Sequence, residues 1–402
     1  MGNEVELSTV ITDIAAGPFG SNLKVECFVP SGFPIIDGAN LKGYKVTDNI
    51  TKFVTEEKAR SLSRSIAHRG DVIVTISGTI GQIAYIPEDS LYDEYLCSQR
   101  QFRVSFDSSM VYVPYLVFYF HTFEGQNKIL SFANQTGVPA LSQPLKNFKK
   151  IRLCLPSLQE QRRIASIVET LNDKIENNIK INDNLEQQAQ SYFQELFVDN
   201  ADPEWTTGTI SDLGAVVGGS TPSKAKPEYY TESGIAWITP KDLSINKSKF
   251  VSHGENDITE LGLKNSSAAI MPEGTVLFSS RAPIGYIAIA AGEVTTNQGF
   301  KSVVPKPEIG TPFVYFFLKN TLPVIEGMAS GSTFKEVSGS TMKNVPAVIP
   351  DAETLAKFSD FCAPIFAQQR ILEEQNQSLA TLRDNLLPKL MSGEIDVSSV
   401  LL

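Results

Sequence analysis

Histidine and cysteine are scarce in this sequence of 402 residues, and their scarcity excludes several kinds of site. The three histidines (His68, His121 and His253) stand alone, so neither a Ser-His-Asp triad nor a metal cluster has an obvious base or ligand set. The four cysteines lie far apart without a Cys-x-x-Cys pair, which fits neither a zinc site nor a disulfide framework. They are Cys27, Cys97, Cys154 and Cys362. We expect buried thiols, no metal site and no catalytic residues.

Motifs for nucleotides and for membranes are missing as well. The sequence contains no glycine-rich loop followed by Lys-Ser/Thr, no Gly-x-Gly-x-x-Gly turn after a strand and no Asn-Pro-Pro-aromatic signature. No apolar run approaches the roughly 18 residues of a membrane helix. The first residues show neither the basic patch nor the apolar core of a signal peptide. We therefore expect a cytoplasmic protein with no cofactor of its own.

The net charge of −10 argues at first against nucleic-acid binding. Residues 1–156 carry no net charge and residues 201–350 carry −2, whereas the short segments 157–200 and 351–402 carry −4 each. Contact depends on a local patch and not on the total charge, so either of the longer segments could present a basic face. The composition thus neither establishes nor excludes DNA binding.

An internal repeat divides the chain into two related halves. Residues 31–35 align with residues 233–237 at a shift of 202, and residues 78–81 align with residues 282–285 at a shift of 204. Ser98-Gln99 aligns with Asn297-Gln298, and Lys146-Asn147 with Lys343-Asn344, at shifts of 199 and 197. The falling shift indicates small deletions in loops. We predict a first domain at 1–156, a long helix at 157–200, a second domain at 201–350, and a second long helix with a tail at 351–402.

Each half combines short β-rich runs with helical segments. Residues 72–76 and 276–278 are strand-like and follow a glycine turn, while residues 113–123 and 312–318 have the pattern of helices. This alternation predicts a mixed α/β (α+β) fold of two similar globular domains with glycine-rich sheets. Because the halves repeat, we expect them to be related by pseudo-two-fold symmetry.

After each domain the apolar pattern changes to a period of seven. In the first segment the two rows are Val168, Ile175, Asn182, Ala189, Leu196 and Ile164, Leu171, Asn178, Leu185, Tyr192. In the second they are Phe358, Ile365, Leu372, Leu379, Leu386 and Phe361, Gln368, Gln375, Leu382. Such rows predict two antiparallel coiled-coil helices whose polar seam residues, Asn178, Asn182, Gln368 and Gln375, fix the register. The alternative is that each helix packs on its own domain. Pro364 is expected to kink or delay the second helix.

The ordered motifs of the two halves resemble the specificity subunit of type I restriction–modification enzymes, which has two target recognition domains. The motifs span residues 17–21, 77–81, 155–161, 218–223, 235–243, 279–286, 296–300 and 386–395. Together they cover almost the whole chain. Residues 351–353 (Asp-Ala-Glu) depart from the Gln-rich start that the family usually repeats after each domain.

The resemblance implies a non-catalytic DNA-recognition subunit. Each domain would read one half of a bipartite target in double-stranded DNA, and the helices would set the spacer and dock DNA methyltransferase (modification) subunits. S-adenosylmethionine, ATP and Mg²⁺ would belong to those partners and to a restriction/translocase subunit. Two alternatives stay open. One is the specificity subunit of another multisubunit or orphan methyltransferase system, and the other is a helical scaffold that does not bind DNA.

Polar, glycine-lined loops supply the candidate DNA contacts, because backbone amides and short hydroxyls approach phosphates while Arg, Asn and Gln read base edges. In the first half we select Gly20, Ser21, Lys24, Ser77, Thr79, Gln99 and Arg100. In the second half we select Thr221, Ser223, Lys224, Lys226, Lys241, Ser280, Arg281, Gln298 and Lys301. Trp237 is predicted to be a core residue, and Asp242 to cap its loop.

Overall fold

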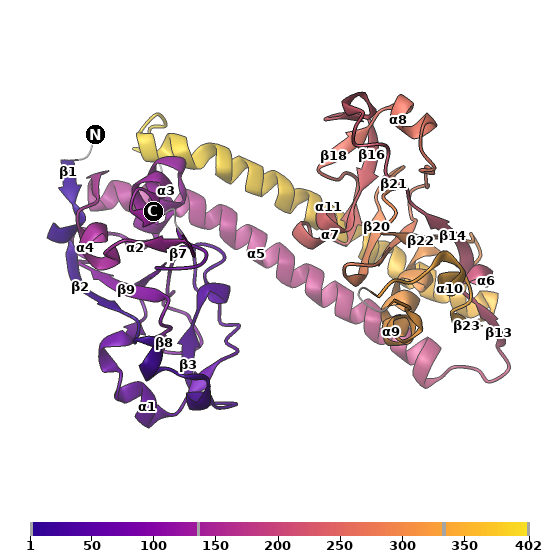
Figure 1. Cartoon of the computed structure of the whole chain (residues 1–402), viewed down its shortest axis with the longest axis horizontal. Helices are drawn as coiled ribbons and strands as arrows, with labels where there is room; N and C mark the ends of the chain where they lie inside the picture. Colours follow the sequence, from indigo (N-terminus) through magenta and orange to yellow (C-terminus); the bar gives the residue numbers. More distant parts are fainter. Residues whose placement is uncertain (1–2, 135–136, 332–334, 400–402) are drawn as a thin grey trace. The chain divides into compact units, whose positions relative to one another are not determined.

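The computed structural model describes residues 3–134, 137–331 and 335–399. The chain forms two compact units, one of residues 1–174 with 378–402 and the other of residues 175–377. Each unit consists of one mixed α/β domain together with parts of two long helices, α5 (Leu158–Gln194) and α11 (Ala352–Ser392) (Figure 1). Among the residues described, no helix combines the length and the apolar character needed to cross a bilayer.

The first unit contains two four-stranded sheets. One is antiparallel and has the order β2 (Ile11–Ala16), β9 (Gln101–Phe106), β6 (Val72–Thr75), β7 (Ile83–Tyr85). The other has the order β4 (Phe53–Val54), β3 (Phe33–Ile36), β8 (Glu94–Cys97), β5 (Ile66–His68), with β3 and β8 parallel. Two further pairs are β1 (Asn3–Glu6) with β12 (Arg152–Leu155) and β10 (Ala133–Asn134) with β11 (Ala140–Leu141). The short helices are α1 (Glu56–Arg60), α2 (Val113–His121), α3 (Phe123–Leu130) and α4 (Pro144–Lys149).

The second unit repeats this plan. Its larger sheet has the order β14 (Gly214–Gly218), β22 (Lys301–Pro305), β19 (Val276–Ser280), β20 (Ile284–Ala290), β17 (Phe250–Val251). Its smaller sheet has the order β15 (Tyr230–Thr231), β18 (Asn256–Ile258), β16 (Ile235–Ile238), β21 (Thr295–Thr296), and β13 (Thr206–Thr209) pairs with β23 (Pro346–Ile349). The helices are α6 (Ile210–Leu213), α7 (Pro240–Ile245), α8 (Glu260–Lys264), α9 (Thr311–Met328) and α10 (Gly339–Lys343).

Corresponding backbone hydrogen bonds confirm the repeat. The amide of Ile76 donates to the carbonyl of Arg100 at 2.7 Å, and in the second unit the amide of Ser280 donates to the carbonyl of Gly299 at 2.7 Å. Likewise, the amide of Ser98 donates to the carbonyl of Ile36 at 2.9 Å, and in the second unit the amide of Asn297 donates to the carbonyl of Ile238 at 3.0 Å. The glycines that lie two residues before the corresponding strands β6 and β19, Gly70 and Gly274, have φ of 81° and 83°, a region that L side chains rarely adopt. The two domains are therefore two copies of one fold.

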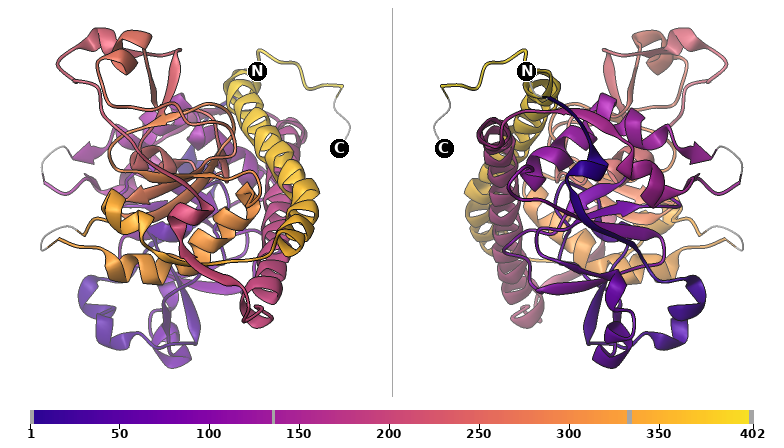
Figure 2. Two further views of the ribbon diagram at one scale, coloured as in Figure 1. Left: turned by 90° about the vertical axis from the view of Figure 1, so that its right-hand side faces the viewer. Right: turned by 90° about the vertical axis from the view of Figure 1, so that its left-hand side faces the viewer.

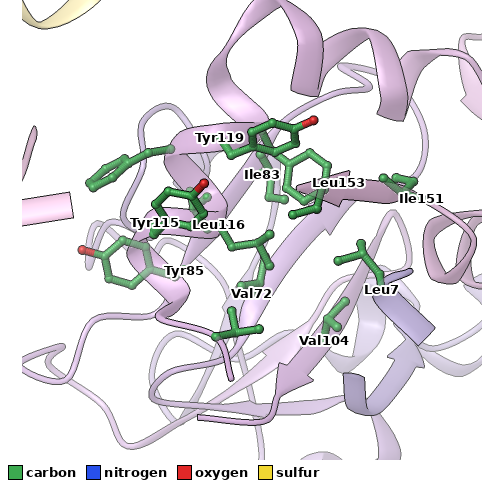
Figure 3. Packing of buried hydrophobic residues seen from close by; sticks show 14 of the residues in the cluster. Leu7, Val72, Ile83, Tyr85, Val104, Tyr115, Leu116, Tyr119, Ile151 and Leu153 are labelled. Carbon is green, nitrogen blue, oxygen red and sulfur yellow. The ribbon is translucent and has the colours of Figure 1, made fainter. Parts of the chain in front are cut away.

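The core of the first domain lies between its antiparallel sheet and helix α2. Tyr115 and Leu116 from α2 pack with Val72 and Ile83 from β6 and β7, and Val104 from β9 belongs to the same cluster (Figure 3). Burying each such aliphatic or aromatic side chain stabilises the fold by roughly 1.5–3 kcal/mol. The cluster also includes side chains of α5 and α11, namely Ile164, Ala165, Val168, Leu387 and Leu390. The long helices are therefore part of the domain core.

The long helices run antiparallel, as predicted. Within the second unit, Asn178 of α5 contacts Asn376 of α11 at 2.9 Å, whereas Tyr192, further along α5, lies with its ring 4.5 Å from that of Phe361, earlier in α11. In the first unit, the guanidinium of Arg383 donates to Asn172 Oδ1 at 3.0 Å. Within each unit, the ribbons of α5 (pink) and α11 (yellow) run side by side in Figures 1 and 2. Within each unit, the two helices therefore form a coiled-coil pair.

Two details of the second helix differ from the prediction. Helix α11 begins at Ala352 and continues through Pro364, so this proline does not delay it. Gln368 is exposed, and its neighbour Gln369 is the buried seam residue, at 3% exposure. The second seam row runs through Cys362 and Gln369, which are buried, and Asn376, which is half-buried, so it is one residue later than predicted. Gln375 of the predicted row is exposed, and its Oε1 lies 3.5 Å from Asn178 Nδ2. In a seven-residue repeat the second row can follow the first by three or four positions, and the apolar Phe361 favoured the wrong choice.

Candidate nucleic-acid interface

Polar loops of the first domain enclose a cavity of about 520 Å³. Its lining includes four of the residues that the sequence singled out, Ser77, Thr79, Gln99 and Arg100. The first two follow β6, and the other two lie in the turn between β8 and β9. Thr79, Gln99 and Arg100 are exposed. The fold therefore brings two sequence-distant loops together into one polar site.

The loop that carries Gly20, Ser21 and Lys24 lies beside this cavity. A Cβ atom on Gly20 would lie 2.8 Å from Oε1 of the Gln99 side chain, so the two loops are neighbours. Ser21 and Lys24 are exposed, and Leu23 and Val25, adjacent to Lys24 in sequence, line the cavity. All seven candidates of the first half therefore lie in or next to one concave surface.

Several polar residues of the same cavity escaped the sequence analysis. Asp37 and Lys52 form an ion pair at 2.6 Å. Gln82 accepts a hydrogen bond from the Thr75 hydroxyl and donates to the carbonyl of Gly38, both at 3.1 Å, so its amide group has a fixed orientation. These residues belong to no recognisable motif. The only available signal was that Asp37 directly follows a strand.

In the second domain a chain of contacts links four of the candidates. The hydroxyl of Thr221 donates to Oε1 of the Gln298 side chain. The backbone carbonyl of Gln298 accepts from Lys301 Nζ at 3.4 Å. Glu336 lies 3.9 Å from Lys301 and 3.5 Å from Arg281. Burial lowers the pKa of Lys301 below its ordinary value, against the opposing effect of Glu336. Thr221, Arg281, Gln298 and Lys301 thus form one cluster that corresponds to the first-domain site.

Ser280 does not belong to the accessible surface and is a correction to the predicted contacts. Its side chain is fully buried, and both its amide and its hydroxyl donate to the carbonyl of Gly299, at 2.7 and 3.1 Å. A buried hydroxyl satisfied in this way supports the loop and cannot reach DNA. The position was misjudged because its neighbour Arg281 is partly exposed and shares the same motif.

The remaining candidates take no part in these contacts. Ser223, Lys224 and Lys226 follow Thr221 on the loop after β14, and Lys241 lies in helix α7. Lys241 pairs with Glu255 at 2.6 Å, and Lys226 lies 3.6 Å from Glu228. Ser223 and Lys224 are exposed.

Trp237 and Asp242 have the structural roles expected of them. Trp237 is 6% exposed and donates from Nε1 to the carbonyl of Ser220 at 3.0 Å. Asp242 accepts from the amide and the hydroxyl of Thr239 at 2.7 and 2.6 Å and so caps helix α7.

Two copies of one domain, each with a polar loop site at corresponding positions and each followed by a long coiled-coil helix, define the class of a duplicated recognition subunit. Residues 29–187 and 203–382 match the family model described as type I restriction modification DNA specificity domain. The chain therefore belongs to the type I restriction–modification specificity family. Proteins of this family are DNA-recognition subunits without catalytic activity.

Relatives and solved structures agree with this assignment. The chain is 39% identical over 194 residues to the type I restriction enzyme MjaIX specificity subunit of Methanocaldococcus jannaschii, a match that covers 46% of this chain and 45% of that protein. It is 22% identical over 392 residues to the HindI specificity subunit of Haemophilus influenzae, covering 78% of this chain and 84% of that protein. The S subunit of the type I system of M. genitalium has the same fold, with a TM-score of 0.60 at 15% identity over 96% of this chain and 95% of that one.

Proposed function

We propose that each domain reads one half of a bipartite sequence in double-stranded DNA. The observation that carries this proposal is that corresponding backbone positions bear different side chains. Arg100 of the first domain corresponds to Gly299, because both carbonyls accept the equivalent hydrogen bond. Ser77 corresponds to Arg281, because both form the equivalent bridge to a later segment. Two domains of the same fold that present different side chains at their loop sites can recognise two different half-sites, as an asymmetric, bipartite target requires.

The chemistry of the two loop sites suits base edges as well as phosphates. Gln99 and Gln298 occupy corresponding, exposed positions, and an amide side chain can pair with adenine through two hydrogen bonds. Arg100 and Arg281 can donate to guanine or to phosphate. Backbone next to Gly20 can approach the DNA closely because no side chain intervenes. Each site therefore combines residues for positioning with residues for discrimination.

The long helices set the spacing in this proposal and dock methyltransferase subunits. Their segments at 157–200 and 351–402 each carry a net charge of −4, which disfavours a position against DNA phosphates and suits a protein partner. The methyltransferase partner would supply S-adenosylmethionine, and a restriction/translocase partner would supply ATP-driven cleavage with Mg²⁺. This chain would determine the DNA sequence on which the complex acts.

The proposal is tested by combining the chain with its methyltransferase subunit and sequencing the modified adenines. The expected wild-type result is a bipartite motif with an unspecified spacer. Gln99→Ala should relax one half of the motif and Gln298→Ala the other, each by about tenfold in preference. Lys264→Ala, on the exposed face of α8, is the matched control and should leave the motif unchanged. Methylation without sequence preference would instead favour a scaffold role.

A further inference from the structure

An ion pair lies inside the first-domain cavity, where its charges cancel. Oδ2 of Asp37 accepts from Lys52 Nζ at 2.6 Å, and Oδ1 accepts from the amide of Ala39 at 2.8 Å. The side chain of Lys52 is 48% exposed and that of Asp37 is 22% exposed. Both residues line the same cavity as Gln99 and Arg100. The pair is therefore both held in place and accessible from the cavity.

Such a pair is unsuited to attracting phosphates. Burial alone would raise the pKa of Asp37, but Lys52 and the Ala39 amide lower it below its ordinary value, so the carboxylate is ionised at neutral pH. Its negative charge opposes a phosphate that approaches Lys52, and the pair adds no net charge to the general attraction of DNA. Bringing the pair out of water is costly unless the incoming group satisfies both the ammonium and the carboxylate. Groups that satisfy only one of them are rejected.

We propose that Asp37 and Lys52 together determine the base recognised at one position of the half-site read by the first domain, and that this position is a G·C pair. In the major groove, guanine offers two adjacent acceptors for a lysine, and the amino group of its paired cytosine donates to a carboxylate. An A·T pair separates its acceptors by a donor and adds a methyl group. The inference rests on the proposed function and names a specificity determinant for it.

Among the residues that the structure describes, the second domain has no equivalent pair. The backbone carbonyls of Ile36 and Ile238 accept equivalent hydrogen bonds, so the residues that follow them, Asp37 and Thr239, occupy corresponding positions. The hydroxyl of Thr239 is occupied by Asp242 at 2.6 Å. Loss of the Asp37–Lys52 pair should therefore affect only one half of the recognised sequence.

The test uses full-length Lys52→Gln and Asp37→Asn, each combined with the methyltransferase subunit, with modified adenines read by sequencing. Asn at position 37 keeps an oxygen that can accept from the Ala39 amide, so the turn is preserved. We expect the preference for G·C at one position of one half-site to fall about tenfold, with the other half and the spacer unchanged. The control is Arg60→Gln, which breaks an ion pair with Glu94 in the same domain but outside the cavity lining.

The outcomes separate this inference from the function on which it rests. If the wild-type chain directs methylation to a bipartite motif and both variants keep that motif at every position, the inference is wrong and the proposed function stands. If the variants lose methylation equally at all sites while retaining the wild-type thermal unfolding midpoint, the pair contributes affinity and not specificity, which also overturns it. If the wild-type chain shows no bipartite motif, both fail. If Asp37→Asn does not fold, the methylation motif of Lys52→Gln alone tests the inference by the same criteria.

Discussion

The ammonium group of Lys249 lies 2.8 Å from Oε2 of Glu186, in the interior of the second unit. Glu186 belongs to α5, and Lys249 directly precedes β17 of the second domain. The same ammonium donates to Gln369 of α11 at 2.8 Å and lies 3.5 Å from the centre of the Phe366 ring. One side chain thus connects the domain sheet to both long helices. Because a buried charge tolerates few alternative positions, this contact fixes how the second domain is mounted on the helix pair.

Removing the lysine should destabilise the protein markedly. Lys249→Met leaves Glu186 with Lys319 as its remaining cationic partner in a mostly buried site, and we expect a loss of about 3–5 kcal/mol in the free energy of unfolding. The double variant Lys249→Met with Glu186→Gln should recover a large part of this loss, because it also removes the buried carboxylate that has lost one of its two cationic partners. Urea denaturation measures both. Lys264→Met, whose side chain is 75% exposed, is the control and should change stability by less than about 0.5 kcal/mol. Equal losses in the single and double variants would contradict the prediction.

Glu186 should also give the protein a specific sensitivity to acid. Burial alone would raise the pKa of Glu186, but Lys249 and Lys319 lower it from 4.5 to about 2. Between these values the unfolded chain binds more protons than the folded one, so this contribution is complete above pH 4.5 and disappears as the pH falls toward 2. The amount is about 3 kcal/mol. Denaturation curves measured from pH 5 to pH 2 should therefore fall less steeply for Glu186→Gln than for the wild type. Parallel curves would show that Glu186 is not the responsible group.

Asn178, in the seam between α5 and α11, should make the protein less stable than an apolar residue at the same position would. Asn178 is fully buried, and its Nδ2 donates to Asn376, but its Oδ1 has no hydrogen-bond partner among the residues that the structure describes. Leaving a buried carbonyl unsatisfied costs about 1–3 kcal/mol. Asn178→Leu should therefore raise the thermal unfolding midpoint, whereas Asn177→Leu, at an exposed position one residue earlier, should not. A lower midpoint for Asn178→Leu would mean that the hydrogen bond to Asn376 outweighs the unsatisfied oxygen.

If the helices set the spacer, lengthening both should lengthen it. A seven-residue insertion keeps the heptad pattern and adds about 10 Å at ~1.5 Å per residue. Placed after Lys174 in α5 and after Gln377 in α11, the insertions enter both helices where the chain divides into its two units. The methylated motif should then keep both half-sites and gain about three base pairs of spacer, at 3.4 Å each. An insertion in α5 alone should abolish methylation, because the two helices no longer match. An unchanged spacer in the double insertion would argue against this role.

The duplicated fold and the coiled-coil helices could be predicted because their signals are local. The glycines at positions 70 and 274 recur with the strands that follow them, and the seven-residue period requires only the order of apolar residues. The first-domain loop residues were also accessible from sequence, because short polar side chains beside glycine mark an exposed loop. Only Ser280 among the selected residues proved to be buried, since exposure of one loop position does not extend to its neighbour.

Sequence by itself determined that two like domains alternate with two amphipathic helices, since repeat and periodicity are properties of order along the chain. Tertiary structure alone decided which side chains share a site. Asp37 and Lys52 meet because β3 and β4 pair, and Gln369, not Gln368, enters the seam because the helix partner selects one of two possible rows. Contacts between residues distant in sequence depend on how the strands pair and the helices pack, and no local pattern encodes that choice.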